Sequence, residues 1–328
     1  MEREILKALR RGGYSSGEDL AKSFGITRAA IWKYIRKLRQ KGYHISSSPR
    51  LGYRLEQAPD LLTPEEIQTD LATKIFGHSI HYLEEVASTQ DEARRLAESG
   101  AAEGTLVVAE AQVAGRGRRG RHWISPPRTG IYLSLILRPH LEPFNIAQIP
   151  IVAGVGVCES IAEITDLQPG LKWPNDVLVE GKKVAGILAE MNAEPERIHY
   201  VILGIGINVN TPTSAFPDNL QPSALSLADA GGRLVSRRIL VQTLLQKLEA
   251  LYDDFKRTGF QALRERCRRW DKTIRSLVEI QDASGSFVGH ALDIDEDGAL
   301  LVKDGEGRIR RVLAGDVTLR QYPGSRVG

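Results

Sequence analysis

Cysteine is scarce in this chain of 328 residues, and no metal-ligand spacing joins the two that occur, Cys158 and Cys267. The pair therefore predicts reduced thiols of a cytoplasmic protein rather than disulfides or a zinc site. The chain has no uninterrupted run of ~18 apolar residues. Its first residues lack the apolar core of a signal peptide. We therefore expect no membrane-spanning helix and no secretion.

Two common nucleotide-binding motifs are also missing. There is no Walker A sequence, and the glycines of Gly204-Ile205-Gly206-Ile207-Asn208 are not followed by a third glycine that opens a helix, as a dinucleotide-binding turn requires. The middle of the chain mixes strand-like and helix-like segments without a regular β-α-β alternation, which predicts an α+β fold. A chain of this length is expected to form two or three domains.

Positive charge is concentrated at the start of the chain. Residues 1–58 contain 13 Lys and Arg and 5 Asp and Glu, a net charge of +8, whereas the whole chain carries +3, so the remainder carries −5. A basic head on a mildly acidic body indicates nucleic-acid binding by the head.

The pattern inside this basic segment is that of a winged helix-turn-helix. Residues 2–11 are apolar at helical spacing and predict a first helix. Ser16 is placed to cap a second helix, Gly25 to make a tight turn, and Thr27 to cap a third. Residues 43–55 alternate on both sides of a Pro/Gly turn and predict a β-hairpin, the wing.

The third helix is the predicted recognition helix, because the first turn of such a helix reaches base edges while Lys and Arg reach phosphates. We expect DNA contacts from Ser16, Thr27, Arg28, Lys33 and Arg50. The same helix is expected to leave Arg36, Lys37 and Arg39 for solvent or phosphates. A module that binds another protein is the alternative for this unit.

A second basic stretch lies between the strand-like runs 105–110 and 131–137. We call it the Gly/Arg loop, and it reads Gly115-Arg116-Gly117-Arg118-Arg119-Gly120-Arg121-His122-Trp123. Glycine lets backbone N–H groups approach a ligand, and arginine presents forked donors that suit phosphate or carboxylate. A solvated loop or a nucleic-acid patch is an equally open interpretation of these residues alone.

Four motifs in order give the chain a resemblance to a known family. They are the Gly/Arg loop, Lys172-Trp173-Pro174-Asn175-Asp176, Gly181-Lys182-Lys183-Val184-Ala185-Gly186-Ile187-Leu188, and Gly204-Ile205-Gly206-Ile207-Asn208. In this order they resemble the motifs of biotin–protein ligases. With the N-terminal helix-turn-helix, the chain resembles the bifunctional bacterial type, biotin ligase and biotin-operon repressor in one, over nearly its whole length.

The resemblance implies an α+β multidomain architecture with three parts. Residues 1–58 would form the winged helix-turn-helix DNA-binding domain. Residues 62–271 would form a central mixed α/β ligase domain, class II synthetase-like and shared with lipoate ligases. Residues 272–324 would form a C-terminal SH3-like β-barrel, in agreement with the short strands and Asp/Gly turns there. Residues 236–270 predict a long helix whose apolar stripe, from Ile239 to Leu251, is core.

The resemblance also implies a reaction. Biotin and ATP, with Mg²⁺, would give biotinyl-5′-adenylate and pyrophosphate, and biotin would then pass to a lysine of a biotin carboxyl carrier protein. A carboxylate must approach an anionic phosphate in the first step, so clustered cations are needed. No Ser-His-Asp or Cys-His nucleophile is required, because the adenylate itself is the reactive acyl donor.

The matched motifs imply which residues take part in each step of the reaction. Biotin is expected to contact Ser88, Thr89, Gln90, Gln112, Arg116, Gly117, Arg118 and Lys183. ATP or the adenylate is expected to contact Gly115, Arg119, Arg121, Trp123, Asn175, Asp176, Gly186, Ile187 and Asn208. The catalytic cations are expected to be Lys183, Arg118 and Lys172, and Mg²⁺ is expected at Asp176, with Asn175 beside it. Many relatives carry Asn where this chain has Gln90.

Simpler structural roles remain open for several of these residues. Ser88 is also placed to cap a helix, Trp173 and Pro174 to pack, and Gly204 and Gly206 to allow close strand packing. Two other functions are possible for the whole chain: a ligand-sensing repressor without catalysis, and a lipoate-type ligase. The arginine loop with Lys183 favours catalysis. The other implied partners are operator DNA and a second copy of the chain when the adenylate is bound, and no membrane is expected.

Overall fold

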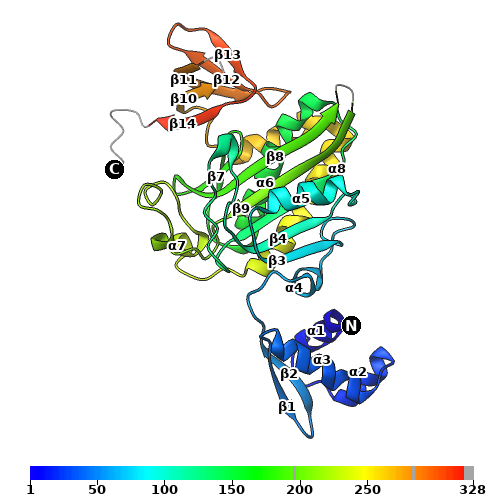
Figure 1. Ribbon diagram of the computed structural model, residues 1–328. Coiled ribbons are helices and arrows are strands. Elements are labelled where there is room, and N and C mark those ends of the chain that lie inside the picture. Colours follow the sequence, from blue (N-terminus) through cyan, green and yellow to red (C-terminus); the bar gives the residue numbers. More distant parts are fainter. Residues whose placement is uncertain (195–196, 283–284, 321–328) are drawn as a thin grey trace. The chain divides into compact units, whose positions relative to one another are not determined.

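A computed structural model of the chain describes residues 1–194, 197–282 and 285–320 (Figure 1). Residues 321–324, which were assigned to the C-terminal domain, lie outside the described residues. The chain divides into two compact units, Met1–Ala72 and Thr73–Gly328.

The N-terminal unit is the expected winged helix-turn-helix. Ser16 Oγ accepts from the backbone N–H groups of Glu18 and Asp19, and Thr27 Oγ1 accepts from that of Ala30, so both predicted caps are present. Gly25 ends the second helix with φ 64°, the left-handed conformation that glycine adopts without strain. The elements are α1 (Glu2–Arg10), α2 (Gly17–Phe24), α3 (Arg28–Gln40), β1 (His44–Ser48), β2 (Gly52–Gln57) and α4 (Pro64–Gln68).

The short helix α4 belongs to this unit rather than to the central domain to which the sequence assigned it. Arg10 Nη2 lies 2.7 and 2.5 Å from the two carboxylate oxygens of Glu66, and Tyr43 Oη donates to the same carboxylate. Glu66 is only 1% exposed, so this pairing compensates a buried charge. The finer domain bounds given above stay a prediction.

The second unit is built on a seven-stranded sheet in the order β3-β4-β5-β9-β8-β7-β6. Only the β3–β4 pair is parallel, which agrees with the absence of regular β-α-β alternation. The strands are β3 (Ile80–Val86), β4 (Leu106–Gln112), β5 (Ile131–Leu137), β6 (Gly170–Lys172), β7 (Asp176–Val179), β8 (Lys182–Glu194) and β9 (Arg197–Ile207).

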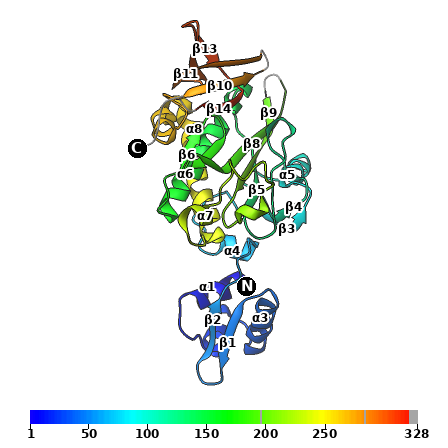
Figure 2. The same ribbon diagram turned by 90° about the vertical axis from the view of Figure 1, so that its left-hand side faces the viewer.

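Helices cover both faces of this sheet (Figure 2). Two successive residues of β9 point to opposite faces of the sheet. Ile202 packs in a cluster with Ala93 and Leu96 of α5 (Thr89–Glu98). Leu203 lies on the other face, beside Val152 and Leu248. The other helical segments are η1 (Arg118–Gly120), η2 (Pro143–Gln148), α6 (Ile149–Ile164), η3 (Thr213–Ala215), α7 (Leu227–Gly231) and α8 (Arg237–Trp270). The strand face that carries Ile202 also carries Gly204 and Gly206, and it is this face that holds the site.

One segment, Pro143–Ile164, is long and apolar enough to cross a membrane by length and composition, with a mean hydropathy of 1.4. The expectation from the sequence, that no segment could span a membrane, was therefore incomplete. In the structure 72% of its apolar window is buried, and α6 packs against α8 and the sheet. This is the pattern of a core helix of a globular protein.

The C-terminal part forms a five-stranded antiparallel sheet in the order β13-β12-β11-β10-β14, as the small β domain predicted for it requires. Its strands are β10 (Leu277–Asp282), β11 (Gly285–Ile294), β12 (Leu300–Asp304), β13 (Ile309–Val312) and β14 (Asp316–Arg320). The preceding helix α8 is interrupted at Gly259, where φ is 73°. The prediction that Ile239 belongs to its buried stripe is wrong, because this residue is 43% exposed in the first turn of the helix.

Candidate active site

Two adjoining cavities share one wall on the α5 side of the large sheet. The first, of about 50 Å³, has its polar end at Ser88, Thr89 and Gln90. The second, of about 480 Å³, extends from Lys172 and Asp176 to residues of β14. Both are lined by Gly117, Arg118, Trp123, Asn175 and Lys183, so they form one continuous site with two ends.

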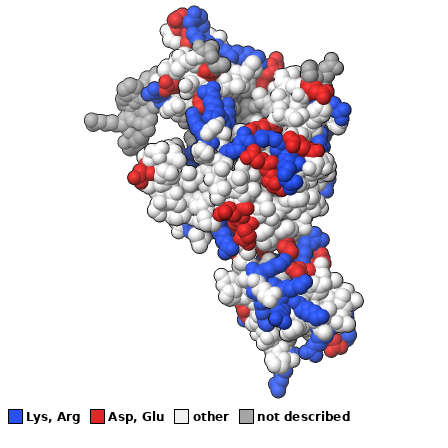
Figure 3. Space-filling model, viewed as in Figure 1, with Lys and Arg blue, Asp and Glu red and all other residues white. Residues whose placement is uncertain are grey.

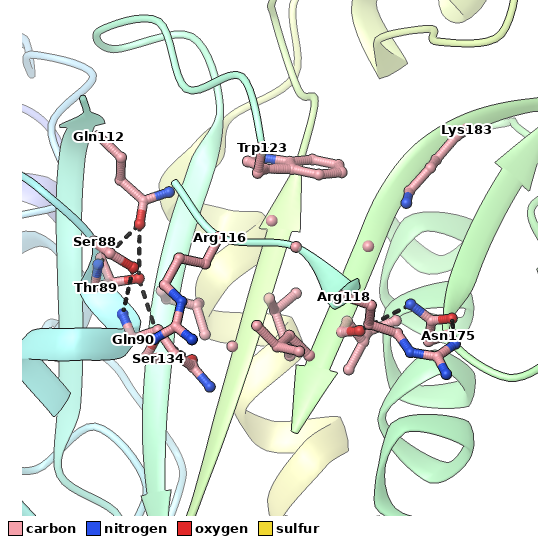
Figure 4. A pocket seen from close by; sticks show the side chains of 18 residues that line it. Ser88, Thr89, Gln90, Gln112, Arg116, Arg118, Trp123, Ser134, Asn175 and Lys183 are labelled. Atoms are coloured by element: carbon pink, nitrogen blue, oxygen red, sulfur yellow. Dashed lines mark hydrogen bonds between the residues drawn. The ribbon is translucent and has the colours of Figure 1, made fainter. Parts of the chain in front are cut away.

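The small cavity ends in a network of uncharged polar groups (Figure 4). Gln112 Oε1 accepts from the backbone N–H of Thr89 at 2.9 Å and from its hydroxyl at 3.1 Å. Ser134 Oγ lies 3.0 Å from both Thr89 Oγ1 and Gln90 Oε1. Gln90 Nε2 donates to the carbonyl of Ile202 at 3.1 Å, which fixes the side chain across the sheet. Ser88 Oγ caps α5 by accepting from the N–H of Gln90. Ser88, Thr89, Gln90 and Ser134 are buried, Gln112 is half-buried, and all are paired, as polar groups in a protein interior must be.

Two glycines of β9 open the middle of the site. A Cβ at Gly206 would lie 2.5 Å from Trp123 Cε2 and Nε1, and a Cβ at Gly204 would lie 2.5 Å from Gln90 Oε1. The indole of Trp123 therefore rests directly on the strand backbone, which requires glycine there. Among the described residues Trp123 Nε1 is a buried donor without a hydrogen-bond partner.

The opposite end of the site is cationic. Lys183 Nζ lies 2.6 Å and Lys172 Nζ 3.0 Å from the carboxylate of Asp176, which is 14% exposed. Burial alone would raise the pKa of Asp176, but the charges and hydrogen bonds of Lys183 and Lys172 outweigh it and hold that pKa below its usual range. Arg118 Nη1 donates to Asn175 Oδ1 at 2.9 Å, while Asn175 Nδ2 donates to the carbonyl of Ile187. The two lysines thus hold the Asp176 carboxylate, while Arg118 is bonded to the adjacent Asn175 and lies 3.9 Å from the carboxylate of Asp316.

The Gly/Arg loop crosses the site as a tight hairpin. Its backbone closes through the Gly117 N–H to the Arg121 carbonyl at 2.7 Å and the Trp123 N–H to the Gly115 carbonyl at 2.9 Å. The C-terminal sheet holds the other side of the loop: Arg121 Nη2 lies 2.5 Å from Asp316, and Arg118 donates to the carbonyl of Gly315.

The residues present do not form a protein-held magnesium site. Asp176 is already bonded to two lysines, and both amide atoms of Asn175 have partners. In the part of the chain that the structure describes, no three His, Cys, Asp or Glu side chains gather as metal ligands. The expected assignment of Mg²⁺ to Asp176 therefore gains no support from the geometry.

The sequence matches three known protein families. Residues 82–208 match the biotin/lipoate A/B protein ligase family, residues 2–54 an HTH domain, and residues 277–320 the biotin protein ligase C-terminal domain. The bifunctional ligase/repressor BirA of Bacillus subtilis is 38% identical over 321 residues, which cover 97% of this chain and 98% of that protein. BirA of Escherichia coli is 30% identical over 97% of this chain and 96% of its own length.

The chain belongs to the BirA family of bifunctional ligase/repressors. Among solved structures, biotin protein ligase from Aquifex aeolicus in complex with biotin and ATP is similar with a TM-score of 0.66 and 33% identity, covering 75% of this chain and all of that chain. The resemblance and the three-part fold that it implied are thereby confirmed.

The structure brings together most of the residues that the BirA-like motifs predicted for the site. All eight predicted biotin contacts line the small cavity. Of the predicted adenylate contacts, the larger cavity contains Arg121, Trp123, Asn175, Asp176 and Asn208, and the small one Gly186 and Ile187. Gly115 lies instead against Gln112 and Ser125, and Arg119 donates to the carbonyl of Gln281 in the C-terminal sheet. The individual roles of these residues stay predictions.

Some residues of the site were missed. Ser134 is fully buried inside β5, where every other residue except Tyr132 is aliphatic, and this lone serine in an apolar strand was the signal that could have found it. Asp316 gave no comparable signal, because it meets the loop only through the fold. Asp91 and Glu190, which bond to Arg116, were missed for the same reason.

The predicted DNA-contact residues lie on the N-terminal unit, where Lys and Arg gather on the face drawn in Figure 3. Arg28, Lys33 and Arg50 are exposed, and the hydroxyls of Ser16 and Thr27 serve as helix caps. Arg39 is exposed as expected, and its guanidinium also donates to the carbonyl of Ile45 in the wing at 2.9 and 2.6 Å. It therefore fixes the wing to α3.

Proposed function

We propose that this protein is an ATP-dependent biotin–protein ligase that also represses transcription, with biotinyl-5′-adenylate as its corepressor. The observation that carries the catalytic part is the two-ended site. A small cavity with an uncharged donor–acceptor network opens into a larger cavity with clustered cations, and the Gly/Arg loop spans both.

The uncharged end suits a neutral, polar ring such as the ureido group of biotin. Such a ring offers both N–H donors and a carbonyl acceptor, and the network of Thr89, Gln112 and Ser134 offers both kinds of partner. Gln90 serves mainly to hold this wall, because its amide is already bonded to Ile202 and Ser134.

The cationic end suits adenylate formation. A biotin carboxylate oxygen attacks the α-phosphorus of ATP, the bond to the bridging oxygen breaks, and pyrophosphate leaves. Lys183 and Arg118 offset the repulsion between the two anions and stabilise the charge that develops on the phosphate oxygens. Asp176 holds Lys183 and Lys172 in place through ion pairs of 2.6 and 3.0 Å. Mg²⁺ is expected to arrive with the ATP phosphates, since it is commonly bound that way.

The second step uses the adenylate as acyl donor. A neutral lysine amine of the biotin carboxyl carrier protein attacks the acyl carbon, AMP leaves with the bonding electrons, and the amine loses a proton as the amide forms. The chain's own contribution is to position the mixed anhydride and exclude water, for which the Gly/Arg loop and the indole of Trp123 are placed. Trp123 Nε1 has an unfilled donor capacity for a ligand in the cavity.

The repressor part rests on the N-terminal unit. Its basic recognition helix is expected to enter the major groove of operator DNA, and its wing is expected to contact the backbone. Two such units on a two-fold operator require a dimer, so we propose homodimerisation when the adenylate is bound. We also propose a cytoplasmic location, which binding to DNA and to a carrier protein supports.

Transfer of biotin to a carrier tests the proposal. The protein is incubated with ATP, Mg²⁺, biotin and an apo biotin carboxyl carrier domain, and the carrier mass is followed. The expected result is a mass increase of one biotinyl group that requires both ATP and biotin. Labelling with lipoic acid but not biotin would reassign the site to a lipoate-type ligase, and binding of biotin without any transfer would leave only a sensor. Sedimentation with and without biotin and ATP tests the dimer.

A further inference from the structure

Four charged side chains form a closed ring beside the small cavity. Arg116 lies 2.5 Å from Asp91 and 2.8 Å from Glu190. Arg94 lies 3.2 Å from the same Asp91 and 2.9 Å from the same Glu190. Each carboxylate therefore contacts both guanidinium groups, and positive and negative charges alternate around the ring.

The ring connects three parts of the chain that surround the cavity. Asp91 follows Gln90 in α5, Glu190 lies two residues beyond Leu188 in β8, and Arg116 belongs to the Gly/Arg loop. Gln90 and Leu188 both line the cavity. The ring thus joins the loop to two separate walls of the site.

The second cation, Arg94, makes it possible for Arg116 to leave. If the loop lifts, Asp91 and Glu190 still share Arg94, so two carboxylates are not left to repel each other. The side chains of the ring are between 26% and 48% exposed, so water and salt compete with each contact. Such a ring favours the closed loop without locking it.

We infer that Asp91 and Glu190 are positioning residues that hold Arg116, and with it the Gly/Arg loop, over the mouth of the cavity. Neither residue is among those that line the two cavities. Their effect is to slow the escape of the adenylate between the two half-reactions, and the inference therefore rests on the proposed ligase function. Because the ring is ionic, retention of the adenylate should weaken as salt concentration rises.

The test is the rate at which preformed biotinyl-5′-adenylate leaves the full-length protein. Asp91→Asn and Glu190→Gln are each expected to release it about three- to tenfold faster, the range that a partly exposed charge-assisted pair supports. The matched control is Glu92→Gln, which removes a carboxylate from the same helix. Glu92 pairs with Arg95 at 2.6 Å rather than with the loop, so wild-type release is expected. Asp91→Glu keeps the charge and should restore slow release.

A double-mutant comparison separates this role from general destabilisation. In an Arg116→Gln background the ring has already lost its loop partner, so adding Glu190→Gln should change release no further. Wild-type release should accelerate with salt, and release from Arg116→Gln should respond much less. Additive effects, or wild-type rates in Asp91→Asn and Glu190→Gln, would overturn the inference. Failure of the wild-type protein to make any adenylate would instead overturn the proposed function.

Discussion

Replacing Gly206 with alanine is expected to damage the adenylate end of the site selectively. The new methyl carbon would lie 2.5 Å from Cε2 and Nε1 of Trp123, whereas ordinary van der Waals contact begins near 3.4 Å. The indole must therefore retreat by about 1 Å, or the strand must shift by a similar amount. The backbone of Trp123 is held in place, because its main-chain N–H donates to the Gly115 carbonyl at the base of the loop.

The size of the effect follows from that displacement. Misplacing a positioning group by about 1 Å can cost on the order of 100-fold in rate. Some of the strain will be taken up by the loop, so we expect kcat/KM for ATP in adenylate formation to fall by about 10- to 100-fold. Pyrophosphate release with ATP varied at saturating biotin measures it.

A second glycine on the same strand face provides the comparison. Gly204→Ala would place its methyl carbon 2.5 Å from Gln90 Oε1, so it should raise KM for biotin rather than for ATP. The control is Gly305→Ala, at a position where the added carbon meets nothing within 4 Å. Wild-type kcat/KM for ATP in Gly206→Ala, or equal effects of both substitutions on both substrates, would refute the assignment of the two ends.

Three further outcomes are expected. Asp176→Asn removes the carboxylate between Lys172 and Lys183 and should lower the free energy of unfolding by about 1–3 kcal/mol, after discounting for solvent access. The pKa of Asp176 is lowered in the folded protein. The wild type should therefore exceed the variant in free energy of unfolding, measured in urea, by a constant amount above about pH 4, and this excess should disappear as pH falls through the lowered pKa. An excess that grows on acidification would contradict the lowered pKa. Arg118→Gly removes the hydrogen bonds to Asn175 and Gly315. It should shorten the half-life of the bound adenylate and cause labelling of bystander lysines. An unchanged half-life would count against closure of the site by the loop. Deletion of residues 1–72 should abolish binding to duplex DNA and spare carrier biotinylation. Fluorescence anisotropy measures the DNA binding. Full operator affinity in the deletion variant would refute the assignment of the DNA-binding unit.

Local sequence signals predicted the secondary structure well because their causes are local. The caps at Ser16 and Thr27 and the turn at Gly25 depend on a few adjacent residues, and all three are present. The exposed Ile239 shows the limit of the method, since helical spacing marks a stripe but not where its ends leave the core.

The site was predictable where one motif supplies several of its residues. The Gly/Arg loop and the segment around Lys183 were found directly from sequence. Residues that meet only through the fold were not: Asp316 and Glu190 reach the loop from positions 195 and 74 residues away along the chain, and no local pattern encodes those pairs. The correct domain for α4 was missed for the same reason, because its buried Glu66 pairs with Arg10, 56 residues earlier.

Direct detection of the intermediate tests the central claim, that the two-ended cavity joins biotin to AMP. The full-length protein is incubated with biotin, ATP and Mg²⁺ without any carrier, quenched, and its bound small molecules are identified by mass spectrometry. The account predicts biotinyl-5′-adenylate stoichiometric with the wild-type chain, little or none with Lys183→Met, and none when lipoic acid replaces biotin. Absence of the adenylate from the wild-type protein, or a lipoyl adenylate in its place, would contradict it.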